Sequence, residues 1–169
     1  MKEDDAPFGI YSESNLENYT LERNKPMPNR IHGYIQSDLI FILRTKYNEQ
    51  FDFPSEVTLD TDPASTPDIL IYPRTQKLDR KETQAKEKVM PLTTIEILSP
   101  SQSLEYLADK VWEVYFPAGV KSAWIVVPAF KAIYVLLPDG QNLYFSEGLL
   151  EDPAIGISLE VKPVFERLV

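Results

Sequence analysis

The stretch LTTIEILSPSQSLEYLADKVWEVYFPAGVKSAWIVVP, residues 92–128, decides the fold. Its first seven residues, 92–98, are mostly apolar and predict a strand that stops at Ser99-Pro100-Ser101. Apolar side chains then recur at helical spacing, with Ser101 or Ser103 as the cap and Pro117 and Gly119 beyond the end. These side chains are Leu104, Leu107, Val111, Val114 and Tyr115. Residues 124–127 (WIVV) predict a strand that is buried on both faces, so the stretch reads as strand, helix, strand.

The segments on either side extend this pattern. Residues 29–47 predict an amphipathic helix capped by Asn29, with Ile31, Ile35, Leu39, Ile42 and Leu43 on its apolar face. Residues 51–59 and 67–72 predict two strands before the decisive stretch. After it, residues 132–137 predict a hairpin partner for 124–127, residues 143–145 a further strand, and residues 157–165 one more edge strand. We therefore expect an α/β fold with a mixed central sheet flanked by helices.

Length and composition indicate one globular domain. The chain has 169 residues, 43% of them hydrophobic, which is enough to form one core. We expect residues 26–169 to form that domain and residues 1–25, which are polar and irregular, to be a loosely ordered lead-in. No stretch approaches the length of a membrane span, and the acidic start does not resemble a signal peptide. The absence of cysteine excludes thiolate chemistry and fits a cytoplasmic protein.

Two acidic residues interrupt apolar strands. Asp68 begins the run Asp-Ile-Leu-Ile-Tyr, and Glu96 lies between Ile95 and Ile97. A carboxylate in such a strand needs a partner, and a divalent cation is one candidate, because Mg²⁺ prefers hard oxygen ligands. The alternative is that these acids point to solvent or pair with a lysine.

The sequence segments around these acids are more specific than the two acids alone. The segments Pro67-Asp68, Glu96-Ile97-Leu98-Ser99-Pro100, Asp109-Lys110, Tyr115 and residues 119–128 together resemble the Uma2-like restriction endonucleases, a large bacterial branch of the PD-(D/E)XK nuclease superfamily. The resemblance runs from about residue 29 to residue 137. It implies a restriction-endonuclease-like core, here with an extra C-terminal β-hairpin, and a Mg²⁺- or Mn²⁺-dependent endonuclease that acts on DNA.

The same resemblance implies roles for three residues. Asp68 and Glu96 match the two acids of the motif and would be metal ligands. The motif's lysine would stand two residues after Glu96, where this chain has Leu98. By similarity Lys110 on the following helix takes its place, because it lies beside the Leu107/Val111 face and its amine could reach inward. There it would orient water or neutralise charge, unless it is an ordinary solvated lysine.

Two further residues could belong to the same site. His32 is the only histidine and falls on the apolar face of the first helix. It is either a packed core residue or, as the resemblance allows, a group near the metal or phosphate. Glu56, on the predicted strand before Asp68, could complete an acidic cluster if its side chain shares that face.

Charge leaves the function open between three hypotheses. The net charge of −9 is unfavourable for a protein that grips DNA, although residues 74–88 are locally basic and lie between the two acid-bearing strands. That segment would contact a phosphate backbone or be a solvated loop. The chain is therefore a metal-dependent endonuclease, a catalytically silent binding module with the same fold, or an interaction protein that forms a homodimer. The last role is compatible with either of the first two.

Overall fold

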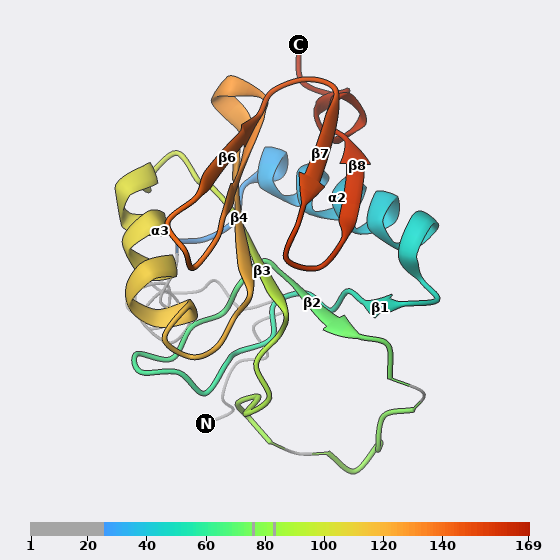
Figure 1. Ribbon diagram of the computed structural model, residues 1–169, viewed down its shortest axis with the longest axis vertical. Coiled ribbons are helices and arrows are strands. Elements are labelled where there is room, and N and C mark those ends of the chain that lie inside the picture. Colours follow the sequence, from blue (N-terminus) through green and yellow to red (C-terminus); the bar gives the residue numbers. More distant parts are fainter. Residues whose placement is uncertain (1–25, 76, 83) are drawn as a thin grey trace, which may run out of the picture.

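The computed structural model describes residues 26–75, 77–82 and 84–169, so the predicted lead-in 1–25 lies outside the described residues. Its elements are drawn in Figure 1. In chain order they are helix α2 (Arg30–Tyr47), strands β1 (Phe51–Asp52), β2 (Ile69–Pro73) and β3 (Thr93–Ile97), helix α3 (Leu104–Lys110), the π-helical turn η1 (Val111–Tyr115), strand β4 (Ser122–Val127), the 3-10 turn η2 (Pro128–Phe130), strands β5 (Ala132–Leu136), β6 (Asn142–Phe145), β7 (Leu149–Asp152) and β8 (Ile157–Glu160), and the 3-10 turn η3 (Lys162–Phe165). None of the described helices is both long and apolar enough to cross a bilayer.

Six strands form one mixed sheet in the order β1-β2-β3-β4-β5-β6. Neighbouring strands are antiparallel except β3 and β4, which are parallel. The parallel pair needs a crossover, and α3 with η1 supplies it. This confirms the strand–helix–strand unit and the mixed sheet expected from residues 92–128.

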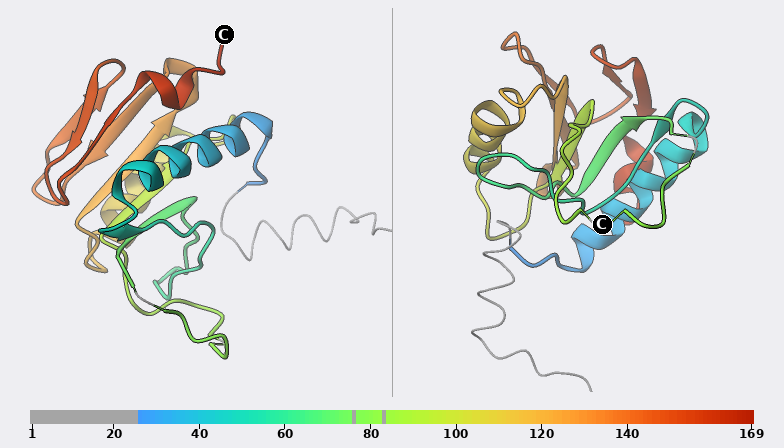
Figure 2. Two further views of the ribbon diagram at one scale, coloured as in Figure 1. Left: turned by 90° about the vertical axis from the view of Figure 1, so that its right-hand side faces the viewer. Right: turned by 90° about the horizontal axis from the view of Figure 1, so that it is seen from below.

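The two helices cover opposite faces of the sheet, as the views in Figure 2 show. On one face α2 packs its buried side chains against alternate residues of the strands, such as Ile69, Ile95 and Trp124. On the other face Leu107 and Val111 pack against the intervening residues, such as Leu70 and Ile125. Alternate side chains of the strands thus pack into two separate hydrophobic cores, one on each face of the sheet.

Capping groups fix where both helices begin. The side chain of Asn29 accepts a hydrogen bond from the backbone N–H of His32, and that of Ser103 accepts one from Tyr106. These contacts confirm Asn29 and select Ser103 from the two predicted serines. After η1 the chain turns through Gly119, whose φ of +102° suits glycine. Both caps place the helices so that His32 and Lys110 face the sheet.

The C-terminal hairpin packs on the α2 side. Strands β7 and β8 form a separate two-stranded sheet rather than extending the main one. Buried Asp152 at the end of β7 accepts hydrogen bonds from Ser122 Oγ at 2.5 Å and Trp124 Nε1 at 2.7 Å, both on β4. A carboxylate buried against the sheet is thus satisfied by strand side chains, and it anchors the hairpin there.

Three local predictions are wrong. The expected strand 51–59 is reduced to Phe51–Asp52, since Glu56 has a φ of +59°, a left-handed conformation that no regular strand accommodates. The tail 157–165 contributes β8 to the hairpin and then turns into η3, so it is no edge strand of the main sheet. Ile31, placed on the apolar face of α2, is 46% exposed because it lies in the first turn, at the margin of that face.

Candidate functional site

Asp68 and Glu96 come together across β2 and β3. The register pairs Ile69 with Ile95, so the next opposed positions are those of Asp68 and Glu96. Opposed residues of an antiparallel pair have Cβ atoms about 5 Å apart. The two side chains are 2% and 3% exposed, respectively. Two carboxylates are therefore held close together at the end of the β2–β3 ladder.

Asp68 is held by groups from two other elements. Its Oδ1 lies 3.0 Å from Nε2 of His32 on α2, and its Oδ2 accepts a hydrogen bond of 2.6 Å from the backbone N–H of Ile97 on β3. The second ring nitrogen of His32, Nδ1, is buried and makes no hydrogen bond within the part of the chain that the structure describes. The contact explains why a histidine lies on the apolar face of α2: it orients Asp68.

Glu96 is held from the opposite face of the sheet. Lys110 Nζ lies 2.8 Å from Glu96 Oε1, and the hydroxyl of Tyr115 donates a short hydrogen bond to the same oxygen. All three side chains are buried, Lys110 being only 6% exposed. The lysine is therefore directed inward, not solvated. Both contacts are made to Oε1, and no hydrogen bond to Oε2 occurs among the described residues.

The hydroxyl of Tyr115 stays protonated in this setting. Burial raises the pKa of Tyr115 well above its ordinary value, and the negative charges of Glu96 and Asp68 raise it further. Tyr115 therefore serves as a hydrogen-bond donor to Glu96.

Glu56 lies beside this centre, although not on a strand. Gln36 of α2 donates one hydrogen bond of 3.2 Å to Glu56 Oε1 and another of 2.8 Å to the backbone carbonyl of Asp68. The backbone N–H of Glu56 also donates to that carbonyl, at 3.3 Å. The bend at Glu56 thus takes the place of strand pairing and holds its carboxylate near Asp68.

The donor set fits a hard divalent cation such as Mg²⁺ or Mn²⁺ better than a metal that prefers thiolate or several imidazole ligands. Within residues 26–75, 77–82 and 84–169, no three His, Cys, Asp or Glu side chains gather into a metal cage. Mg²⁺ often binds through one or two carboxylates, keeps several waters and takes other ligands from phosphate. Asp68 and Glu96 provide such a pair of hard oxygen donors, with Glu96 Oε2 available as a ligand.

Comparisons with known proteins show the family and the fold. A family model, Uma2, described as "Putative restriction endonuclease", matches residues 16–166. The chain belongs to the Uma2 family. A crystal structure of "a putative nuclease belonging to DUF820" from Anabaena variabilis ATCC 29413 has the same fold, with a TM-score of 0.70 and 24% identity over 85% of each chain. A search of curated proteins found no match. The family and the restriction-endonuclease-like fold expected from the sequence are thus confirmed.

Two polar residues of this candidate site were not assigned to it from the sequence. Tyr115 was placed on the apolar face of the helix and quoted in the family resemblance without a role in the site, and Gln36 was given no role. No spacing in the sequence indicated Tyr115, because it follows Lys110 by five residues and a regular α-helix would turn it to a different side. The π-helical turn Val111–Tyr115 lengthens the repeat, so both side chains reach Glu96.

Proposed function

We propose that this Uma2 protein is a metal-dependent endonuclease that hydrolyses DNA phosphodiester bonds at Asp68 and Glu96. The observation that supports it most is the convergence of two buried carboxylates from adjacent strands with the inward-facing ammonium of Lys110. Membership of a family described as restriction endonucleases supports the substrate class. The bound metal, the cleavage of DNA and the roles of the residues are all proposed.

Asp68 and Glu96 would hold Mg²⁺ or Mn²⁺. When bound, such a cation lowers the pKa of a bound water and stabilises charge on the scissile phosphate. The protein's part would be to fix both carboxylates in advance. His32 and the Ile97 N–H orient Asp68, while Lys110 and Tyr115 orient Glu96 through Oε1.

Lys110 would act on the substrate through its charge. An ammonium has three donors and no acceptor, and one donor is engaged with Glu96. The remaining hydrogens would orient the attacking water or neutralise the charge that develops on the phosphate. Because this cation comes from α3, Leu98 at the motif position two residues after Glu96 does not exclude catalysis.

The test is nicking of supercoiled DNA in Mg²⁺ or Mn²⁺ by the wild type, Asp68→Asn and Glu96→Gln. Asp152→Asn is a matched control, because it also alters a buried carboxylate but on the other face of the sheet. The proposal expects nicking by the wild type and the control, and none by the two site variants. Equal nicking by all four proteins would place the activity elsewhere.

A catalytically silent binding module is the second candidate. The net charge of −9 favours it, since non-specific DNA affinity depends on phosphate neutralisation. Such a module would bind Mn²⁺ at Asp68 and Glu96 without cutting any DNA offered. Metal binding without nicking in the wild type would therefore replace the endonuclease proposal with this one.

A further inference from the structure

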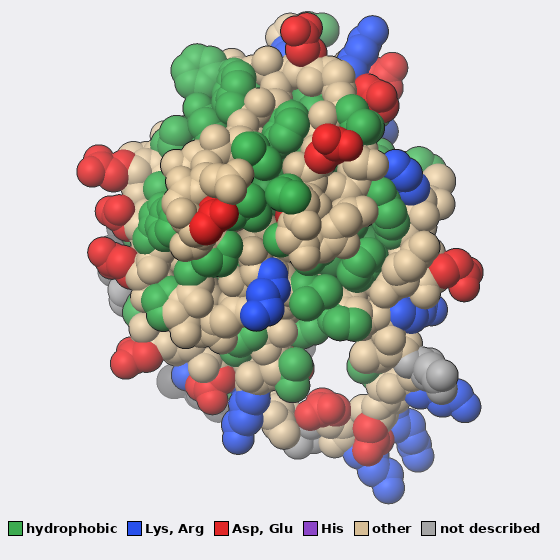
Figure 3. Space-filling view, viewed as in Figure 1, with side chains coloured by type: hydrophobic (Ala, Val, Ile, Leu, Met, Phe, Trp, Pro, Cys, Tyr) green, Lys and Arg blue, Asp and Glu red, His purple; other side chains and the backbone are tan. Residues whose placement is uncertain are grey.

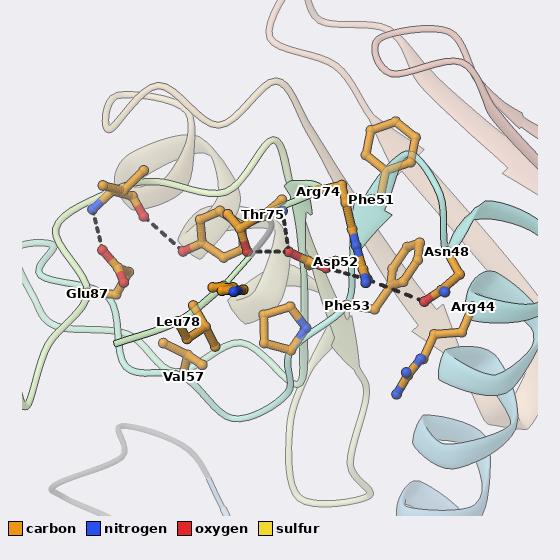
Figure 4. A pocket seen from close by; sticks show the side chains of 14 residues that line it. Arg44, Asn48, Phe51, Asp52, Phe53, Val57, Arg74, Thr75, Leu78 and Glu87 are labelled. Carbon is orange, nitrogen blue, oxygen red and sulfur yellow. Dashed lines mark hydrogen bonds and ion pairs between the residues drawn. The ribbon is translucent and has the colours of Figure 1, made fainter. Parts of the chain in front are cut away.

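A hollow lies away from the carboxylate centre, at the other end of β2. It has a volume of about 700 Å³ and is bounded by the end of α2, strand β1 and the segment that follows β2. Figure 4 shows Arg44 at one side of it, and Val57, Leu78 and Glu87 at the other. The proposed catalytic residues Asp68, Glu96 and Lys110 do not line it.

The lining combines flat apolar rings with basic groups. Phe51, Phe53 and Tyr72 provide aromatic surface, and Leu78, which is 86% exposed, adds an aliphatic side chain. The cations of the lining are Arg44, Arg74 and Lys77. Aromatic faces beside cations are typical of sites for single-stranded nucleic acid, where bases stack and phosphates meet positive charge.

The two acids of the pocket are occupied by the protein itself. Asp52 accepts hydrogen bonds from Arg74 at 2.9 Å and from the Thr75 hydroxyl at 2.7 Å, as the dashed lines in Figure 4 show. Glu87 accepts one from the backbone N–H of Val89 at 2.7 Å. Arg44 and Lys77, in contrast, have no acidic partner within the described part of the chain. Two cations are thus available to an anionic ligand.

The pocket opens beside a basic stretch of an acidic protein. Residues 74–88 contain six Lys or Arg and three Asp or Glu, a local charge of +3 against −9 for the whole chain. Figure 3 shows Lys and Arg gathered at the lower right, where Figure 1 draws the segment between β2 and β3. Charge and stacking surface therefore coincide at one end of the sheet.

We propose that this pocket holds an unpaired base of a DNA strand, with Arg44 and Lys77 on the neighbouring phosphates. The inference rests on the proposed function and narrows its substrate to DNA with a single-stranded segment. Tyr72 follows Asp68 by four residues along β2, or about 13 Å at 3.3 Å per residue. That length corresponds to roughly four stacked nucleotides at 3.4 Å each. One strand could thus reach both sites.

Fluorescence anisotropy in the presence of a metal chelator tests binding apart from cleavage. The probes are a labelled thymidine oligonucleotide, the same length of duplex, and an abasic strand of equal charge. We expect the wild type to bind the thymidine strand about five-fold or more tightly than either other probe. Equal affinity for the thymidine and abasic strands would overturn the proposal, because binding would then depend on phosphate charge and not on a base in the pocket.

Variants locate the binding. Arg44→Ala/Lys77→Ala should weaken binding of the thymidine strand about five-fold or more, whereas Lys162→Ala, an exposed cation outside the pocket, should not. Phe51→Leu keeps an apolar side chain but should abolish the preference over the abasic strand. If the basic double variant and the control bind alike, the pocket is not the site. The binding measurement is made in chelator, where metal-dependent cutting is blocked. It therefore stands even if the wild type fails to nick DNA in the test of the proposed function.

Discussion

The ammonium of Lys110 lies 2.8 Å from Oε1 of Glu96, a buried ion pair that joins α3 to β3 across 14 residues of sequence. Both groups are removed from water, so each depends on the other for compensation. The pair fixes a cation beside the acids that we propose as metal ligands. Substitutions can separate the contribution of this ion pair to stability from its contribution to catalysis.

Loss of Lys110 alone should destabilise the fold. Lys110→Met keeps the stem but leaves Glu96 buried with Tyr115 as its remaining donor, and we expect the free energy of unfolding to fall by about 3–5 kcal/mol. Lys110→Met/Glu96→Gln should recover much of it, because no buried charge remains unpaired. Urea unfolding measures both. About 1 kcal/mol is the precision of this measurement. If the free energy of unfolding of Lys110→Met lies within that range of the wild-type value, the lysine is solvated.

Stability should depend on Tyr115 at alkaline pH. Its pKa is raised in the fold by burial and by the charge of Glu96, so the native state favours the protonated phenol. The stabilisation is complete below the unfolded pKa of about 10 and is lost as pH rises towards the higher folded value. We expect the wild type to lose up to about 1.4 kcal/mol per pH unit above pH 10 relative to Tyr115→Phe. Parallel pH profiles for the two proteins would contradict this.

Metal affinity should depend on His32. Its Nε2 orients Asp68 at 3.0 Å, and loss of such a supporting group typically weakens metal binding about 10–100-fold. Calorimetric titration of His32→Phe with Mn²⁺ should show this loss, while Ser37→Ala, an exposed change on the same helix, should match the wild type. Unchanged affinity in His32→Phe would make the histidine a packing residue.

Stability should also depend on Asp152, without any effect on the metal. Asp152→Asn turns one acceptor into a donor that faces Ser122 Oγ and Trp124 Nε1, and we expect unfolding to become about 1–3 kcal/mol easier. Tryptophan fluorescence should shift because the indole loses its partner. Mn²⁺ affinity should not change, and a parallel loss of affinity would show that the two faces of the sheet are coupled.

The sequence predicted the site well where regular periodicity governs direction. The family resemblance pointed to Lys110, and its helical position beside Leu107 indicated that its amine could reach inward, as it does towards Glu96. The family resemblance assigned Asp68 and Glu96 as a pair, and the β2–β3 register brings them together. Local patterns therefore carry most of the fold.

The sequence could not predict features that depend on irregular backbone. Glu56 was placed on a strand, but its left-handed φ and the contacts to Asp68 and Gln36 depend on tertiary packing. The π-helical turn that brings Tyr115 to Glu96 has no periodic signature. The C-terminal hairpin was predicted, but its packing on the α2 side depends on the long-range hydrogen bond that Trp124 donates to Asp152. Each of these is a contact between distant segments.

The most direct test of the central claim is a calorimetric titration of Mn²⁺ into the wild type, Asp68→Asn and Glu96→Gln. If the two carboxylates form one metal site, the wild type binds Mn²⁺ and each single variant loses affinity about ten-fold or more. If wild type and variants give the same heats, or the wild type gives none, Asp68 and Glu96 are structural acids that His32 and Lys110 hold in place.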